Sequence, residues 1–107
     1  MKEKSRTVHK TTYPHIVKTE GINGGAATIE GTRIAVWHVV GYYYELGMSV
    51  EAILLDWDYL KPAAIFSALA YYHDHRDEIE TSIRADEAFV AELRRNSTSK
   101  VAEKLRG

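Results

Sequence analysis

The spacing of the hydrophobic residues changes once along this chain, near residue 31. Before that point, apolar and polar residues mix in two short runs, His15–Lys18 and Thr28–Glu30, which predict β-strands. The segment between the runs is rich in residues that tolerate a positive φ, namely Gly21, Asn23, Gly24 and Gly25. The pattern therefore predicts a short β-hairpin or looped β unit.

After Gly31 the apolar residues recur every three or four positions, as on one face of a helix. A first helix is predicted from Val36 to about Leu46, with Gly47 ending it. Ser49 is a good N-cap for a second helix over residues 50–56, and Pro62 suits the first position of a third over 62–73. This order of short helices is typical of a helix–turn–helix unit.

Neither glycine nor proline occurs between Ala63 and Asn96. The third helix therefore either continues or breaks near residues 73–77 and restarts with an apolar face of Ile79, Ile83, Val90 and Leu93. The predicted fold is mainly α: a short N-terminal β-hairpin, a three-helix helix–turn–helix-like bundle, and a C-terminal helical extension. We predict a flexible basic arm over residues 1–13, a domain over 14–80, and a helical extension with a mobile tail over 81–107.

The composition fits one domain of 107 residues and excludes several classes of protein. Because the chain has no cysteine, disulfide frameworks and thiolate metal sites are excluded. It has no apolar run long enough for a membrane span, and residues 1–6 do not resemble a signal peptide. A soluble cytoplasmic protein with no membrane association is expected.

The net charge of −1 conceals an uneven distribution. Residues 1–20 carry +3, residues 21–80 carry −6, and residues 81–107 carry +2. The predicted recognition helix, residues 62–73, contains no Lys or Arg, and its polar face is predicted to offer Ser67, Tyr71 and His73. Since DNA affinity depends largely on neutralising phosphates, this helix fits a compact scaffold better than a DNA reader.

Other basic residues could compensate for that deficit. The candidate DNA contacts are Lys2, Lys4, Arg6 and Lys10 of the arm, together with Arg33 and Lys61. For Arg33 a different role is favoured, an ion pair with Asp56 or Asp58 beside the hinge between strand and helix.

Large amphipathic aromatic residues are the candidate partner contacts. Trp37, Tyr42 and Tyr44 cannot all face one small core, so we expect them to lie against another element of the chain, its tail or a second subunit, and we take them as candidate partner contacts. These alternatives remain open.

No catalytic or metal site is predicted. On a helix, His73 and Asp77 lie one turn apart, but two ligands do not make a credible metal site. The chain also lacks a glycine-rich phosphate loop and a nucleophile motif, so no cofactor is expected and the protein is not predicted to be an enzyme.

The order of residues 24–36, Gly-Gly-Ala-Ala-Thr-Ile-Glu-Gly-Thr-Arg-Ile-Ala-Val, resembles the signature of the domain of unknown function 433 (DUF433) family. Segments 46–54, 56–60 and 65–71 continue the resemblance, which covers about residues 15–80. It implies a homeodomain-like or winged-helix-like fold and the role of a VapB-type antitoxin, which binds a toxin of the PIN ribonuclease fold. The chain departs from the family pattern at Ala26, Ala27 and Ala35, where a basic residue and prolines are usual.

Two functional hypotheses follow. In the first, the chain is a dimeric antitoxin-like protein of a prokaryotic type II toxin–antitoxin pair, able to bind operator DNA, whose residues 81–107 dock on the toxin. Arg94 and Arg95 would then reach the acidic metal site of a PIN-type nuclease. In the second, the chain is a dimeric interaction or scaffold domain that does not bind DNA.

Overall fold

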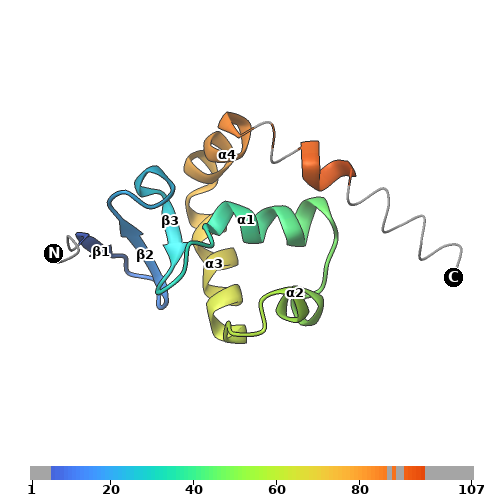
Figure 1. Ribbon diagram of the computed structural model, residues 1–107, viewed down its shortest axis with the longest axis horizontal. Helices are drawn as coiled ribbons and strands as arrows, with labels where there is room; N and C mark the ends of the chain where they lie inside the picture. The colour runs from blue at the N-terminus through green and yellow to red at the C-terminus, as the bar shows by residue number, and fades with distance from the viewer. Residues whose placement is uncertain (1–5, 87, 89–90, 96–107) are drawn as a thin grey trace, which may run out of the picture.

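A three-stranded antiparallel sheet and a group of short helices make up the fold, seen here in a computed structural model that describes residues 6–86, 88 and 91–95 (Figure 1). The mainly helical fold with an N-terminal hairpin is confirmed. In chain order the elements are β1 (Val8–Lys10), β2 (Ile16–Thr19), the 3₁₀ turn η1 (Asn23–Gly25), β3 (Ala27–Ile29), α1 (Val36–Val40), the π-helical turn η2 (Gly41–Glu45), α2 (Val50–Asp56), α3 (Pro62–Asp74) and α4 (Arg76–Ala85).

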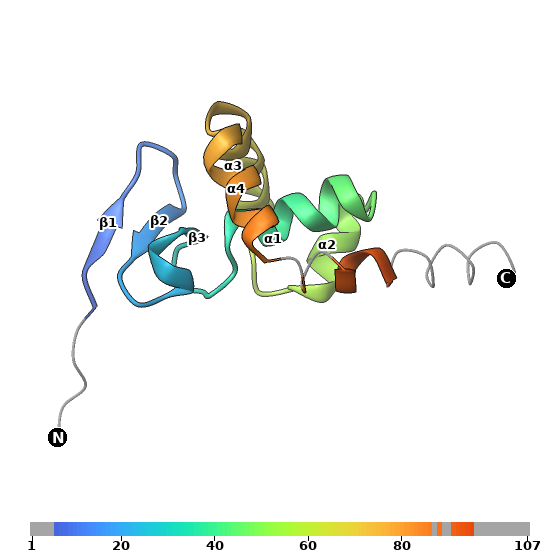
Figure 2. The same ribbon diagram turned by 90° about the horizontal axis from the view of Figure 1, so that it is seen from above.

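The sheet has the order β1-β2-β3, with β2 in the centre. The predicted hairpin is the pair β2–β3, in which Ile16 lies opposite Ile29. β1 was not predicted: the expectation of a flexible arm over residues 1–13 is wrong for Val8–Lys10, which pair antiparallel with β2. β1 is the outer strand of the sheet (Figure 2). All three of its side chains are exposed, so no alternation marks this strand in the sequence.

Thr32 fixes the hinge between the sheet and α1. Gly31 adopts a φ of +81°, which favours glycine. The Thr32 hydroxyl donates to the backbone oxygen of Ile29 at 2.8 Å and accepts from the backbone N–H of Ile34 at 3.0 Å. Because both bonds stay within the turn, the chain leaves β3 and enters α1 in one defined direction.

The first predicted helix is divided. The α-helical part ends at Val40, and a wider turn follows, in which the backbone N–H of Leu46 donates to the oxygen of Gly41 at 3.0 Å. α2 occupies the predicted residues, and the Ser49 hydroxyl caps it by accepting from the N–H of Ala52 at 3.1 Å.

The long helical region after Pro62 breaks at His75, which confirms the predicted break. Of the face predicted for the restarted helix, Ile79 and Ile83 lie on α4, Leu93 lies beyond the end of α4, and Val90 is outside the described residues. His75 leaves the helical conformation, with φ −135° and ψ 45°, and α4 begins at the next residue. Residues 91–95 form a further helical turn in which Leu93 is buried.

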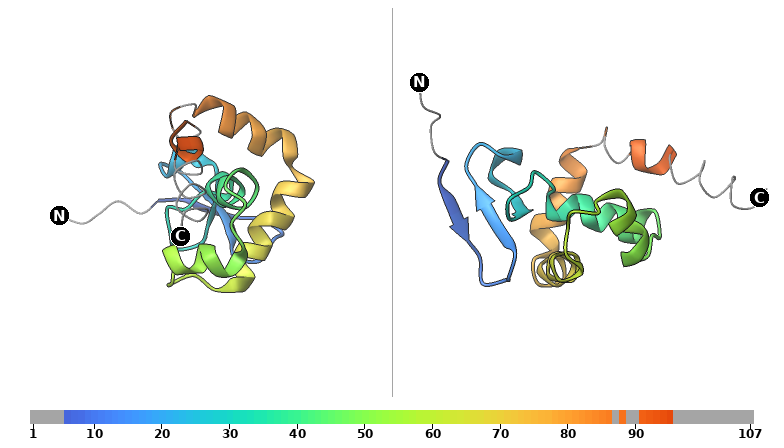
Figure 3. Two further views of the ribbon diagram at one scale, coloured as in Figure 1. Left: turned by 90° about the vertical axis from the view of Figure 1, so that its right-hand side faces the viewer. Right: turned by 60° about the horizontal axis from the view of Figure 1, so that its bottom comes forward.

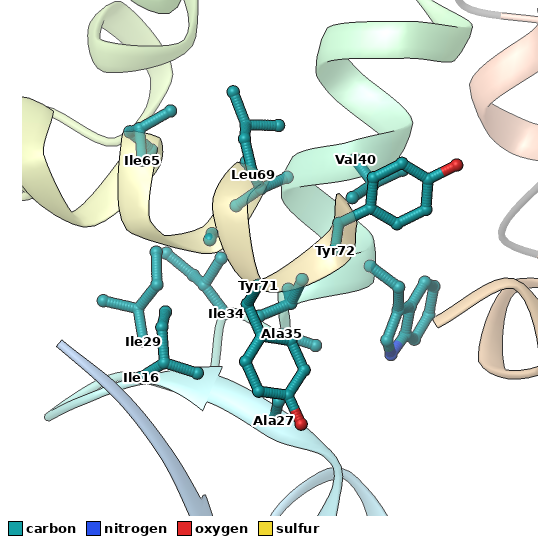
Figure 4. Close-up of a cluster of buried hydrophobic side chains, with 14 of the residues drawn as sticks. Ile16, Ala27, Ile29, Ile34, Ala35, Val40, Ile65, Leu69, Tyr71 and Tyr72 are labelled. Carbon is teal, nitrogen blue, oxygen red and sulfur yellow. The ribbon is translucent and has the colours of Figure 1, made fainter. Parts of the chain in front are cut away.

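The core lies where α1 and α3 meet the sheet (Figure 4). In an end-on view of α1, the helices α2, α3 and α4 surround it (Figure 3, left). Most of α1 is buried, and within the described residues no helix is long and apolar enough to cross a membrane. The labelled core side chains of Figure 4 come from the sheet, the hinge, α1 and α3: Ile16, Ala27, Ile29, Ile34, Ala35, Val40, Ile65, Leu69, Tyr71 and Tyr72.

Candidate functional site

An open groove lies between the sheet, the hinge and the turn that joins α2 to α3. It has a volume of about 860 Å³ and is called the basic groove below. Its lining is Arg6, Val8, Thr19, Ile22, Gly31, Thr32, Arg33 and Tyr59. A smaller hollow of about 330 Å³ shares Gly31, Thr32 and Tyr59 with it and adds Lys61 and Glu30. The structure thus brings together three of the predicted DNA contacts, Arg6, Arg33 and Lys61.

Arg33 does not form the ion pair that the sequence favoured. Within the described part of the chain, the guanidinium has no carboxylate within ion-pair distance, so the predicted pairing with Asp56 or Asp58 is wrong. The physical reason is that the Thr32 hydroxyl already holds the hinge, so an ion pair of Arg33 is not needed there. Arg33 is bound through its backbone oxygen, which accepts from Asn23 Nδ2 at 2.8 Å. Its side chain is therefore exposed at the groove.

Arg6 reaches the same groove from the start of the sheet. Its side chain crosses Gly21 so closely that a Cβ at that position would lie 3.2 Å from Arg6 Nε. Lys2 and Lys4, two further predicted contacts, lie outside the described residues.

Lys10 lies elsewhere, beside a hollow of about 250 Å³ that also contains Tyr13, Lys18, Tyr71 and His75. There Lys18 Nζ is 3.2 Å from Glu78, whose carboxylate accepts from the Tyr71 hydroxyl at 3.0 Å. Burial and the bond to Glu78 raise the pKa of Tyr71. Burial is the largest single influence on Lys18 and lowers its pKa, but the bond to Glu78 and the negative charges of Glu78 and Tyr71 together outweigh it, so the lysine pKa is raised.

The same cluster joins the sheet to the helix break. The His75 ring stacks on Tyr71, with the centroids 4.1 Å apart, and its Nδ1 donates to the Tyr71 backbone oxygen at 3.0 Å. The Tyr13 hydroxyl donates to Asp74. Because these groups bind one another, the cluster links the sheet to the helix break and stabilises the fold.

The exposed face of α3 is apolar. Ala63, Phe66 and Ala70 lie at positions i, i+3 and i+7 and are all exposed, Phe66 by 58%. We call these three residues the apolar face of α3. Leu55 of α2 and Tyr59 of the connecting turn are also strongly exposed, by 83% and 66%.

The polar face predicted for α3 is largely directed into the molecule. Tyr71 is buried, and the Ser67 hydroxyl donates to the backbone oxygen of Pro14 in front of the sheet. Only His73 of that set is exposed, and its Nε2 lies 2.8 Å from the Tyr44 hydroxyl. Sequence reasoning missed the apolar face, although the spacing of Ala63, Phe66 and Ala70 was a visible signal for it.

The aromatic residues predicted to bind a partner differ in exposure. Trp37 is 8% exposed and belongs to the core, because α1 lies at the centre of the fold, so for this residue the alternative of packing within its own chain holds and the partner contact does not. Tyr42 is half-buried and stacks in parallel on Trp57, with the centroids 4.7 Å apart. Tyr44 remains half-exposed, which leaves it as the accessible member of the set.

Arg94 and Arg95 form ion pairs within the chain. Arg94 Nε lies 3.6 Å from Glu45 Oε1, and Arg95 pairs with Glu92. Both side chains are about two-thirds exposed, since only the neighbouring Leu93 is buried. A partner that used these arginines would have to compete with weak surface ion pairs.

His73 and Asp77, the pair considered for metal binding, do not gain a third ligand from the fold. Within the described residues, no three His, Asp or Glu side chains are grouped closely enough to hold a metal ion.

The comparison with known proteins rests on the span from β2 to α3. Residues 16–72 match the family model described as "Protein of unknown function (DUF433)". The chain belongs to the DUF433 family. A crystal structure of a DUF433 member from Anabaena variabilis ATCC 29413 has 31% sequence identity and a TM-score of 0.62, and the similarity covers 65% of this chain and 68% of that one. No curated protein matches the chain.

The DUF433 match includes some of the candidate groups and leaves out others. Arg33, Tyr59, Lys61 and the apolar face of α3 lie within it, whereas Arg6, β1 and residues 91–95 lie outside. The groove therefore combines residues of the family domain with two N-terminal residues beyond the matched span, Arg6 and Val8.

Proposed function

We propose that this DUF433 protein is an antitoxin-like protein that binds a partner protein through the apolar face of α3. The observation that carries the proposal is the exposure of Phe66, flanked by Ala63 and Ala70, on the helix that would read DNA in a helix–turn–helix protein. Covering such a face removes apolar surface from water, which favours protein association. A helix without Lys or Arg gains no comparable binding free energy on DNA, because it neutralises no phosphates.

The charges on α2 and on the turn before α3 indicate what kind of surface the partner should have. Glu51, Asp56 and Asp58 are exposed on α2 and on the turn before α3. A partner with an apolar pocket and a basic rim would complement them. The resemblance to VapB-type antitoxins makes a PIN-type toxin the expected partner, encoded beside this protein.

Arg94 and Arg95 have a subordinate role in this proposal. They would leave Glu45 and Glu92 and contact the acidic metal site of the nuclease. Reversing both charges, in Arg94→Glu with Arg95→Glu, should weaken inhibition of the toxin in a nuclease assay. Full inhibition by the double variant would show that these arginines are not needed.

A second candidate is a homodimer that buries the same face. The apolar face of α3 could pack against its own copy about a two-fold axis, because one apolar helix face is complementary to another. This would make the chain a dimeric scaffold that does not bind DNA.

Co-expression with the product of the neighbouring gene, followed by affinity capture, tests the proposal. A stable complex with a nuclease-like protein is expected, and Phe66→Asp should abolish it. Thr81→Asp, which adds the same charge at an exposed position of α4, is the matched control and should leave the complex intact.

Light scattering of the isolated protein separates the two candidates. A dimer that dissociates with Phe66→Asp supports the scaffold, whereas a dimer that survives this substitution agrees with a dimeric antitoxin-like protein whose apolar face stays available to its partner. A monomer that captures no neighbouring gene product would contradict both. A mobility-shift assay with the chain's own upstream DNA tests operator binding, and a Phe66→Asp variant that still shifted this DNA would show that any operator contact lies outside the apolar face.

A further inference from the structure

We propose that the basic groove binds single-stranded nucleic acid, with Arg6 and Arg33 on the phosphates and Tyr59 stacked on a base. This site goes beyond the proposed function, because it uses the sheet, the hinge and the α2–α3 turn rather than the apolar face of α3. It also places nucleic-acid contacts on a surface other than the usual recognition helix.

The charges of the groove support an anionic ligand. Arg6 and Arg33 are exposed, and neither forms an ion pair within the described part of the chain. Among the residues that the structure describes, no carboxylate lines the groove, although residues 21–80 carry a net charge of −6. Lys61 extends the basic surface into the adjoining hollow, where Glu30 is the one acid of the lining. The groove is thus locally positive in an acidic domain.

Tyr59 distinguishes a single strand from a duplex. Its ring is 66% exposed and lines both hollows, so it lies between the side that holds Arg33 and the side that holds Lys61. An exposed aromatic ring beside arginines can stack on an unpaired base, whereas the bases of a duplex are already stacked on one another.

The backbone beside Tyr59 leaves room for a ligand. Gly31 lines both hollows, and a Cβ built on it would have no heavy atom within 4 Å. Val8 and Ile22 add apolar surface for the sugar and base edges. The groove thus offers cations, a stacking ring and open backbone together.

Fluorescence anisotropy with the full chain tests the proposal. The probes are labelled single strands of DNA and of RNA, of mixed sequence and about 12 nucleotides long, which is within the range of single-strand sites. We expect Arg6→Gln and Arg33→Gln each to weaken binding several-fold and to reduce the slope of log affinity against log salt by about 0.7. Tyr59→Ala should weaken binding roughly tenfold with the slope unchanged, and Tyr59→Phe should restore it.

Lys10→Gln is the matched control, since it removes the same charge from β1 beside a different hollow. It should weaken binding much less than Arg33→Gln. Phe66→Asp should leave strand binding intact even if it abolishes partner binding, which separates this proposal from the previous one.

Three results would overturn the proposal: no binding at low salt, equal binding of a duplex of the same sequence, or equal effects of Lys10→Gln and Arg33→Gln. Circular dichroism of every variant shows whether it is folded. If a variant is unfolded, Tyr59→Phe against Tyr59→Ala gives the decisive comparison, because Tyr59 is mostly exposed.

Discussion

The basic groove and the apolar face of α3 lie on the same small domain and differ in chemistry. α2 and α3 follow one another across a short turn, as the two helices of a helix–turn–helix do, but the exposed face of α3 carries Phe66 and two alanines in place of cations. The cations Arg6 and Arg33 lie instead where the sheet meets the hinge. The difference teaches that the shape of a recognition motif and the charges that make it bind DNA can be separated within one fold.

The largest effect on stability is expected at two neighbouring residues of α3, one of which faces the core and the other the solvent. Ile65 is fully buried and Phe66 is 58% exposed. Ile65→Ala should lower the free energy of unfolding by about 2–5 kcal/mol, because it leaves a cavity in the core. Phe66→Ala should change it by less than about 0.5 kcal/mol in urea denaturation. A large, concentration-dependent loss with Phe66→Ala would show that a second copy covers this face.

A smaller effect is expected at the hinge. Gly31 has a φ of +81°, so Gly31→Ala should cost about 1–2 kcal/mol of unfolding free energy although the Cβ has open space around it. Since Gly31 lines the groove, the same variant should also weaken single-strand binding. A variant that lost stability but bound normally would separate the hinge from the groove.

Ser49, at the start of α2, allows a stability change of similar size to be made away from the groove. Ser49→Ala removes the cap of α2 and should cost about 1 kcal/mol, measured by thermal or urea unfolding. Single-strand binding should be unchanged after this substitution. If binding fell as well, the groove and the α2–α3 unit would be coupled rather than independent.

The smallest effect is expected for the dependence of stability on pH. Burial lowers the pKa of His38, and its Nδ1 accepts from the backbone N–H of Ala35 at 2.9 Å, so the folded state favours the neutral ring. The unfolded chain takes up the proton more readily, and stability should therefore fall as the pH drops through about 6.5. His38→Asn keeps an acceptor and should flatten the dependence of Tm on pH.

The helices could be predicted well because their signals are local. α2 was predicted to the residue from Ser49 and its apolar repeat, and the start of α3 followed from Pro62. The break at His75 could only be given as an alternative, because the bond of its ring to the Tyr71 backbone and the stacking on Tyr71 arise in the folded chain.

The candidate sites depended on contacts that the sequence does not display. The partner of Arg33 was predicted from the surplus of acids, but Thr32 closed the hinge by itself. β1 could not be found because its strand character comes from pairing with β2. A phosphate contact of Arg33 beside the basic arm was the less favoured alternative to the ion pair, and the structure places Arg6 of that arm at the same groove. The residues of the groove were named from charge, whereas their proximity required the structure.

The bonds from α3 to the start of the sheet have a consequence for the order of folding. Ser67 contacts Pro14 across 53 positions, and Asp74 contacts Tyr13 across 61. During synthesis the strands leave the ribosome first, but their supporting surface exists only after α3 has been made. Contacts of such long range form late, so the first-made part of this domain is expected to be the last to gain protection from hydrogen exchange.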